Sequence, residues 1–277
     1  MIFAAKNLLA DRVNLIQNDY AAGLPSPLAF LGLADCLVRE LGLTPWSARV
    51  LPVLHEVTAS EGRMKPEMEK SGARFATIET IEGMHGRVRA SLLIDLPGCE
   101  DETAVARALA GKRIAGGPIA GRHIDIRPVG AADGGVFPML RRGYAMVRPD
   151  PASRPEGADN EPPIAGRLGV SRGDEAGLAR VAQELFPAEK IKGSGWVVPC
   201  AAGYRLIEDP ARVPERAGVR TPEVPHVFAE PLVGIAELIS VRNARMRDAD
   251  ADVLDDLCWR WSARDDLILA HPSYHLH

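Results

Sequence analysis

The residues from Gly86 to Leu96 alternate between an apolar and a partly polar face, and this alternation constrains the fold most. The apolar face would hold Val88, Ala90, Leu92 and Ile94, and the opposite face Arg87, Arg89, Ser91 and Leu93. A half-buried strand with arginines on its open face is typical of an antiparallel sheet with one solvated side. A second alternating segment, His123 to Pro128, places Ile124 and Ile126 inward. We therefore predict an antiparallel sheet.

Helix signals occur in three places. Ser26-Pro27 is a capping pair before apolar residues at helical spacing, and Gly42 is expected to end that helix. Ser171 and Asp174 precede an apolar run that Pro187 ends, which predicts a second helix. Acidic residues from Asp248 to Asp252 precede an apolar run ending at Trp261, which predicts a C-terminal helix.

Three further segments are predicted to be strands, which makes the chain α+β rather than an alternating βαβ protein. They are Arg49–Val57, Trp196–Ile207 and His226–Ile239. Trp196 is expected in the core because Val197 and Val198 follow it. We divide the single chain 1–277 into a core, 1–147, a proline-rich loop and helix insertion, 148–194, and C-terminal strands with a helix, 195–277.

Composition limits the functional classes. The 277 residues carry 33 basic and 37 acidic side chains, a formal net charge of −4 that excludes a polyanion binder of the histone type. The N-terminus has no secretory pattern and no apolar run is long enough to span a bilayer, so we expect a cytoplasmic protein without membrane contact. The four cysteines lie far apart, and we expect reduced thiols rather than a metal site.

Catalytic motifs are incomplete. His55-Glu56 begins an H-E-x-x-H pattern, but Ala59 stands at the second histidine. Gly111 to Gly116 has the spacing of a phosphate-binding loop, but Gly117-Pro118 replaces the lysine and hydroxyl residue. We therefore predict no catalytic residue, no metal and no cofactor.

Arginine clusters are the remaining signal. Arg141-Arg142 precedes Gly143-Tyr144, and two more groups are Arg242, Arg245 and Arg247, and a loop beginning with Arg205. Arginine beside an aromatic residue and glycine is a common way to hold phosphates and stack unpaired bases. Ordinary surface arginine is the alternative interpretation of each cluster.

Six segments in order resemble one family, the smaller RNA-capping subunit of the type I-F (Csy-type) CRISPR surveillance complex. They are Asn14–Ile16 with Gly23–Gly32, Ile81–Gly83 before the Arg87 strand, Arg113–Gly117, Gly143–Val147, Gly195–Pro199 with Gly203-Tyr204, and Phe228–Ser240 continuing to Leu257–Trp261. The G-W-V-V-P run is the most specific of them. The family's proline-histidine-arginine run reads Ser240-Val241-Arg242-Asn243 here. The stretch from Thr58 to Arg74 and the insertion between Val147 and Gly195 are shorter than their family counterparts, so the chain resembles a compact or variant member.

The resemblance implies an RRM-like, ferredoxin-like antiparallel sheet with helices on one face, as in the repeat-associated mysterious proteins (RAMPs). It implies a non-catalytic cap that holds the 5′ handle of the guide RNA (crRNA) and docks the large and backbone subunits. Target DNA is then met only indirectly, because guide pairing reads its sequence. The residues we assign to RNA binding are Asn14, Gln17, Asn18, Tyr20, Arg87, Arg89, Gly116, Gly117, Arg141, Arg142, Tyr144, Arg205, Arg242, Arg245 and Arg247.

Two other functions stay open at this point. One is a metal-independent endoribonuclease that cuts CRISPR precursor RNA, with His85, His123 and Tyr144 as its candidate residues. The other is a generic RRM-like module that binds many RNAs without preference for the handle.

Overall fold

The computed structural model describes most of the N-terminal half and most of the C-terminal third of the chain. The described residues are 1–17, 22–60, 68–77, 84–121, 123–129, 137, 140–147, 149, 179, 182–187, 194–216, 218–219, 221, 224–247, 249, 257–264 and 266–272. The expected capping box at Ser171 and Asp174 lies outside these residues, although residues 182–185 are helical.

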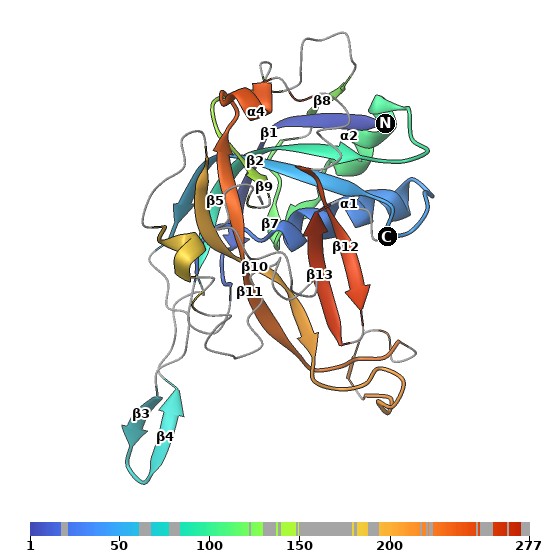
Figure 1. The fold of residues 1–277 in the computed structure, drawn as a ribbon. Coiled ribbons are helices and arrows are strands. Elements are labelled where there is room, and N and C mark those ends of the chain that lie inside the picture. The colour runs from blue at the N-terminus through green and yellow to red at the C-terminus, as the bar shows by residue number, and fades with distance from the viewer. Residues whose placement is uncertain are drawn as a thin grey trace.

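A nine-stranded antiparallel sheet organises the described part of the chain (Figure 1), which confirms an α+β fold with few helices. Its order is β12-β13-β10-β11-β9-β2-β5-β1-β8. The strands are β1 (Ile2–Asn14), β2 (Arg49–Ala59), β5 (His85–Asp95), β8 (Asp125–Pro128), β9 (Tyr144–Val147), β10 (Trp196–Leu206), β11 (Ala229–Ser240), β12 (Trp259–Arg264) and β13 (Leu267–Pro272). The helices are α1 (Pro27–Glu40), α2 (Glu102–Leu109) and the short α4 (Ala244–Arg247).

Two small hairpins accompany this sheet. The first, β3 (Met68–Ser71) with β4 (Arg74–Thr77), projects away from the body of the protein (Figure 1). The second, β6 (Arg113–Ile114) with β7 (Gly117–Pro118), lies against β1. This second hairpin positions the candidate site.

The sheet closes on itself through β12. One edge of β2 pairs with β5, and the other edge pairs with β9 at Val53–Leu54 and with β12 at Val50. Trp259 is the partner of Val50; its indole is 1% exposed, and Nε1–H donates to the Met146 carbonyl at 2.8 Å. The C-terminal strands therefore complete the same sheet as the N-terminal ones.

Helix α1 forms where its capping signals predict. The Ser26 hydroxyl accepts a hydrogen bond from the backbone N–H of Leu28 at 3.1 Å, and Pro27 is the first helical residue. The helix ends at Glu40, and Gly42 follows with a φ of +67°, a conformation that favours glycine. The Ser26 hydroxyl also donates to the Ala201 carbonyl at 2.5 Å, which joins the helix start to β10.

Both faces of the central sheet are packed, which corrects the expectation of one solvated side. The apolar face of β5 packs in one core with α1 and α2, as its alternation predicts. On the other face, Leu93 belongs to a second buried cluster that Phe137 and Met246 help to form. Phe137 and Met246, which cover this face, lie far from β5 in the sequence, so the alternation alone did not reveal them. Only the Arg87–Arg89 end of this face stays partly open.

Two further expectations are wrong. Trp196 is 63% exposed rather than in the core, because it begins β10 at the margin of the sheet. Trp261, expected at the end of a helix, lies in strand β12, where pairing with β13 overrides the local helical pattern. Among the described residues, no helix has the length and apolar character needed to cross a membrane.

Candidate nucleic-acid interface

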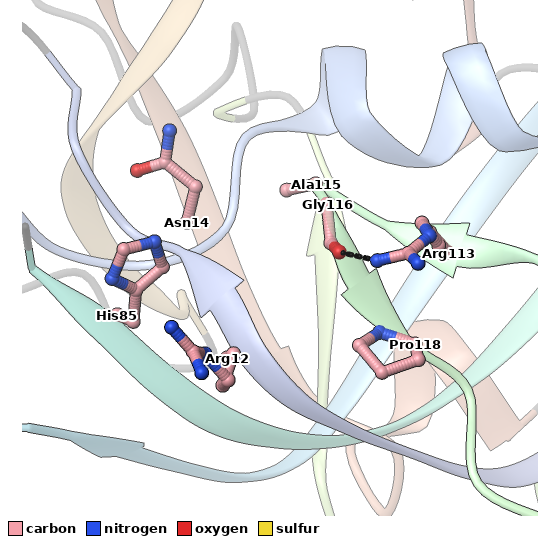
Figure 2. A pocket seen from close by; sticks show the side chains of 7 residues that line it. All are labelled: Arg12, Asn14, His85, Arg113, Ala115, Gly116 and Pro118. Carbon is pink, nitrogen blue, oxygen red and sulfur yellow. Dashed lines mark hydrogen bonds between the residues drawn. The ribbon is translucent and has the colours of Figure 1, made fainter.

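A basic pocket lies where β1 ends, β5 begins and the β6–β7 hairpin turns (Figure 2). Its volume is about 530 Å³, and its lining residues are Arg12, Asn14, His85, Arg113, Ala115, Gly116 and Pro118. The lining contains two guanidinium groups and no carboxylate. A pocket of this composition is suited to hold an anionic group such as a phosphate.

The turn of the β6–β7 hairpin is fixed on the end of β1. The Asn14 backbone N–H donates to the Ala115 carbonyl at 3.0 Å, and Arg113 Nη1 donates to the Gly116 carbonyl at 2.9 Å. Ala115 and Gly116 both have left-handed backbones, with φ of +44° and +83°. Gly116 is exposed and has nothing within 4 Å of its Cβ direction, so a ligand can approach its backbone closely.

Gly117, by contrast, is required for packing within the protein. A Cβ on Gly117 would lie 2.5 Å from the Asp11 carbonyl oxygen and 2.8 Å from the Val13 backbone nitrogen. The hairpin therefore touches the β1 backbone at a buried glycine. The two adjacent glycines, both expected at RNA, have different structural roles.

We expect Gly117→Ala to destabilise the protein by about 2–4 kcal/mol, because the β1 backbone has no room to yield. Gly116→Ala is expected to cost about 1–2 kcal/mol, the price of a left-handed backbone alone. Urea unfolding of the two variants measures both. Equal losses would show that the close approach of Gly117 to Asp11 and Val13 contributes nothing to stability.

A strip of basic groups extends from this pocket over the open end of the sheet. Arg87 is 61% exposed at its side chain and pairs with Asp11 at 2.6 Å. Arg89 is 29% exposed, with its Nε 3.7 Å from a Glu56 carboxylate oxygen. Arg142 follows Arg89 along the strip, because its carbonyl is hydrogen-bonded to the ring of His55 on β2. The strip thus alternates basic side chains with two carboxylates.

His55 anchors the loop before β9 to this strip. Its Nδ1 lies 3.0 Å from the Arg142 carbonyl and its Nε2 lies 2.7 Å from the Ser91 hydroxyl. Because a carbonyl only accepts, Nδ1 carries the proton and Nε2 accepts from Ser91, which itself accepts from the Asn7 N–H at 3.1 Å. Ser91 is fully buried, so this serine–histidine pair is closed to a substrate.

Burial lowers the pKa of His55 below its ordinary value, and the nearby charges of Arg141 and Arg89 lower it further against the opposing effect of the Arg142 bond. The native state therefore favours the neutral ring more than the unfolded chain does. The stability that His55 contributes is complete above its ordinary pKa of 6.5 and is lost as the pH falls from there toward the native pKa.

The wild-type protein should lose unfolding free energy as the pH falls from about 7 to about 5. We expect this loss to be smaller in His55→Gln, by at most about 1.4 kcal/mol per pH unit. Urea unfolding across that range measures this slope. His123→Gln, a change at an exposed histidine, is the control and should leave the slope unchanged. An identical slope in wild type and His55→Gln would contradict the lowered pKa of His55 in the native state.

Other predicted residues lie in or near the strip. Tyr144, 46% exposed, begins β9, and Arg141 before it is exposed. The Val241 N–H donates to the Gly143 carbonyl at 3.1 Å, which brings exposed Arg242 next to this loop. Arg247 is also exposed, in α4.

Three other predicted residues make contacts within the protein, as Arg87 does. Gln17 is 4% exposed, and its amide donates to the Pro199 carbonyl at 3.0 Å. Arg245 Nη1 lies 3.3 Å from the carboxylate of Glu237, which is 2% exposed. Arg205 pairs with Asp266 at 2.9 Å. Asn18 and Tyr20 lie outside the described residues.

Arg12, Arg113 and His85 line the pocket but were not predicted to bind RNA. Arg113 had a sequence signal, because it lies three residues before Gly116 in the glycine-rich run. Arg12 had no sequence signal. What distinguishes it is a structural feature, a left-handed backbone with φ of +58° where the pairing of β1 with β5 is interrupted. Of the three candidates for ribonuclease chemistry, only His85 lines the pocket.

Comparison with known proteins gives one finding. Residues 174–269 match the family model described as CRISPR-associated protein (Cas_Csy2), a range that includes β10, β11, α4, β12 and the start of β13. No curated protein matches the chain. The family match supports a CRISPR-associated protein of the Csy type.

Proposed function

We propose that this chain is a non-catalytic, RNA-binding subunit of a type I-F CRISPR effector complex, which caps the 5′ handle of the guide RNA. It would dock the large and backbone subunits in the cytoplasm, and meet target DNA only through the guide. The match to the Csy-type family model supports the CRISPR assignment.

The observation that carries the RNA-binding role is the pocket with Arg12 and Arg113 beside the turn at Ala115 and exposed Gly116. Guanidinium groups bind phosphate oxygens, and an unobstructed glycine backbone permits close approach of the sugar-phosphate chain. The basic strip from Arg87 to Arg142 continues from this pocket and would accept further nucleotides, with Tyr144 available to stack on a base.

The strand order supports an RRM-like core. The elements β1, α1, β2, β5, α2 and β8 follow in sequence, and their strands are arranged as β8-β1-β5-β2 with antiparallel neighbours. Two interleaved βαβ units with this strand order are typical of the ferredoxin-like fold, which supports the proposed RRM-like core. In this arrangement the pocket would lie between β1 and β5, the first and third strands, and the connection that precedes β8, the fourth.

Incubation of labelled repeat RNA with the purified chain separates a cap from a ribonuclease. We expect the RNA to remain intact, because His85 lines the pocket without His123 or Tyr144 beside it. Cleavage by the purified chain that disappears in His85→Ala would establish the ribonuclease and overturn the proposal. Metal-free buffer excludes contaminating metal-dependent nucleases, and a mock purification without the chain reveals metal-independent ones.

A further inference from the structure

The connection between β10 and β11 lies at the ends of these strands away from β1 (Figure 1) and carries exposed apolar residues. Ile207 is 60% exposed, Val224 51% and Phe228 62%. The Ile207 N–H donates to the Phe228 carbonyl at 2.9 Å, so these two residues are held side by side at the base of the connection. We call Ile207 and Phe228 the apolar platform.

Hydrogen bonds, an ion pair and a cation–π contact hold the platform in place. Two carboxylate oxygens of Glu208 accept from Arg216 Nη2 at 2.6 and 2.7 Å, and the His226 carbonyl accepts from Arg216 Nε at 2.9 Å. The Arg216 guanidinium lies 4.5 Å from the centre of the Phe228 ring. Glu208 also accepts from the Phe228 N–H at 2.8 Å. Glu208 holds the Phe228 backbone and Arg216 covers one face of its ring, so this exposed side chain loses little freedom on binding.

The charges around the platform oppose a nucleic acid. Residues 205–230 contain five acidic and four basic side chains, and Asp266 adds another carboxylate beside Arg205. Of the described arginines in this segment, Arg212 pairs with Asp209 at 3.2 Å and Arg216 with Glu208. Glu215 and Glu230 are exposed at the rim. Phosphates would be repelled by this rim, whereas a protein with basic side chains around an apolar centre would be attracted.

We propose that the apolar platform is a docking site for a protein partner whose surface has an apolar pocket bordered by lysine or arginine. Phe228 is its central anchor, because preordered aromatic side chains dominate binding energy at such interfaces. Glu215 and Glu230 steer the basic partner toward it. The choice of partner rests on the proposed function, which places a large subunit and a backbone subunit beside this chain.

The test measures binding of the full-length chain to each of these two subunits, purified separately and without RNA. We expect Phe228→Ala to weaken binding to one of them about thirtyfold, while Phe228→Tyr binds nearly as wild type. Phe186→Ala, at another exposed phenylalanine (80%), is the matched control and should leave binding unchanged. Circular dichroism and thermal melting confirm that each variant is folded.

Reversal of the rim charge tests the steering. Glu215→Lys with Glu230→Lys is expected to slow association and weaken its dependence on salt, whereas Glu100→Lys with Glu102→Lys, exposed acids at and before α2, should not. Handle-RNA affinity, measured separately, should stay at the wild-type value in all these variants.

Three results would overturn the proposal that the apolar platform is a docking site. Binding of neither subunit by the unsubstituted chain, or equal binding by wild type and Phe228→Ala, would show that no partner docks there. Loss of handle-RNA affinity in Phe228→Ala with partner binding intact would make the surface part of a nucleic-acid site. None of these depends on the basic pocket, whose variants are tested by RNA affinity alone.

Discussion

Replacement of both Arg12 and Arg113 by alanine is expected to lower the affinity of the protein for handle RNA about a hundredfold. The two guanidinium groups line one pocket, and loss of a charge-assisted hydrogen bond costs about 1.5–3 kcal/mol. The salt dependence should change as well, because each lost phosphate contact reduces the slope of log K against log salt by about 0.7 for a single strand. Filter binding at several salt concentrations, with the chain in its assembled complex, measures both.

The control removes the same charge elsewhere. Arg107→Ala with Arg127→Ala substitutes exposed arginines of α2 and β8, and should reduce affinity only slightly. Equal losses from the two pairs would mean that binding follows net charge and not the pocket. The generic-module alternative differs in another way, since it predicts the same loss for handle RNA and for an unrelated RNA.

Trp259→Ala is expected to destabilise the protein by about 3–5 kcal/mol, the largest effect on stability that we predict. The indole is 1% exposed, it pairs β12 with β2 at Val50, and its Nε1 is bonded to the Met146 carbonyl. Trp259→Phe should cost about 1–2 kcal/mol, because it keeps most of the ring and leaves the carbonyl unpaired. Urea unfolding followed by circular dichroism measures the change.

Trp46→Ala is the matched control for this prediction. Trp46 is 60% exposed and stacks edge-on against Trp261, so its removal should change the unfolding free energy by less than about 1 kcal/mol. An unchanged unfolding midpoint in Trp259→Ala would show that β12 does not belong to the cooperative unit formed by β2 and its neighbours.

Local patterns predicted the individual elements well. The alternation from Gly86 to Leu96 corresponds to β5, and the Ser26-Pro27 pair begins α1, because both signals depend on neighbours in sequence. The strands β2, β10 and β11 lie close to their predicted bounds for the same reason. The division of the chain at residues 147 and 194 stays a prediction.

Features that depend on distant contacts were not accessible to the same reasoning. The second core needs Phe137 and Met246 to lie over Leu93, and no spacing links these residues. From the sequence, Gln17 is expected to be an exposed loop amide. In the structure its side chain donates a hydrogen bond to the carbonyl of Pro199 on β10. Arg12 enters the pocket only because the β6–β7 hairpin, a hundred residues later in the chain, lies against the end of β1.

Co-expression of the chain with the neighbouring reading frames and a repeat-spacer array tests the capping role most directly. Size-exclusion chromatography followed by sequencing of the bound RNA is the measurement. The account predicts a large ribonucleoprotein that contains this chain and uniform RNAs with a repeat-derived 5′ end. An RNA-free monomer, with the other subunits assembled on guide RNA without it, would contradict the account.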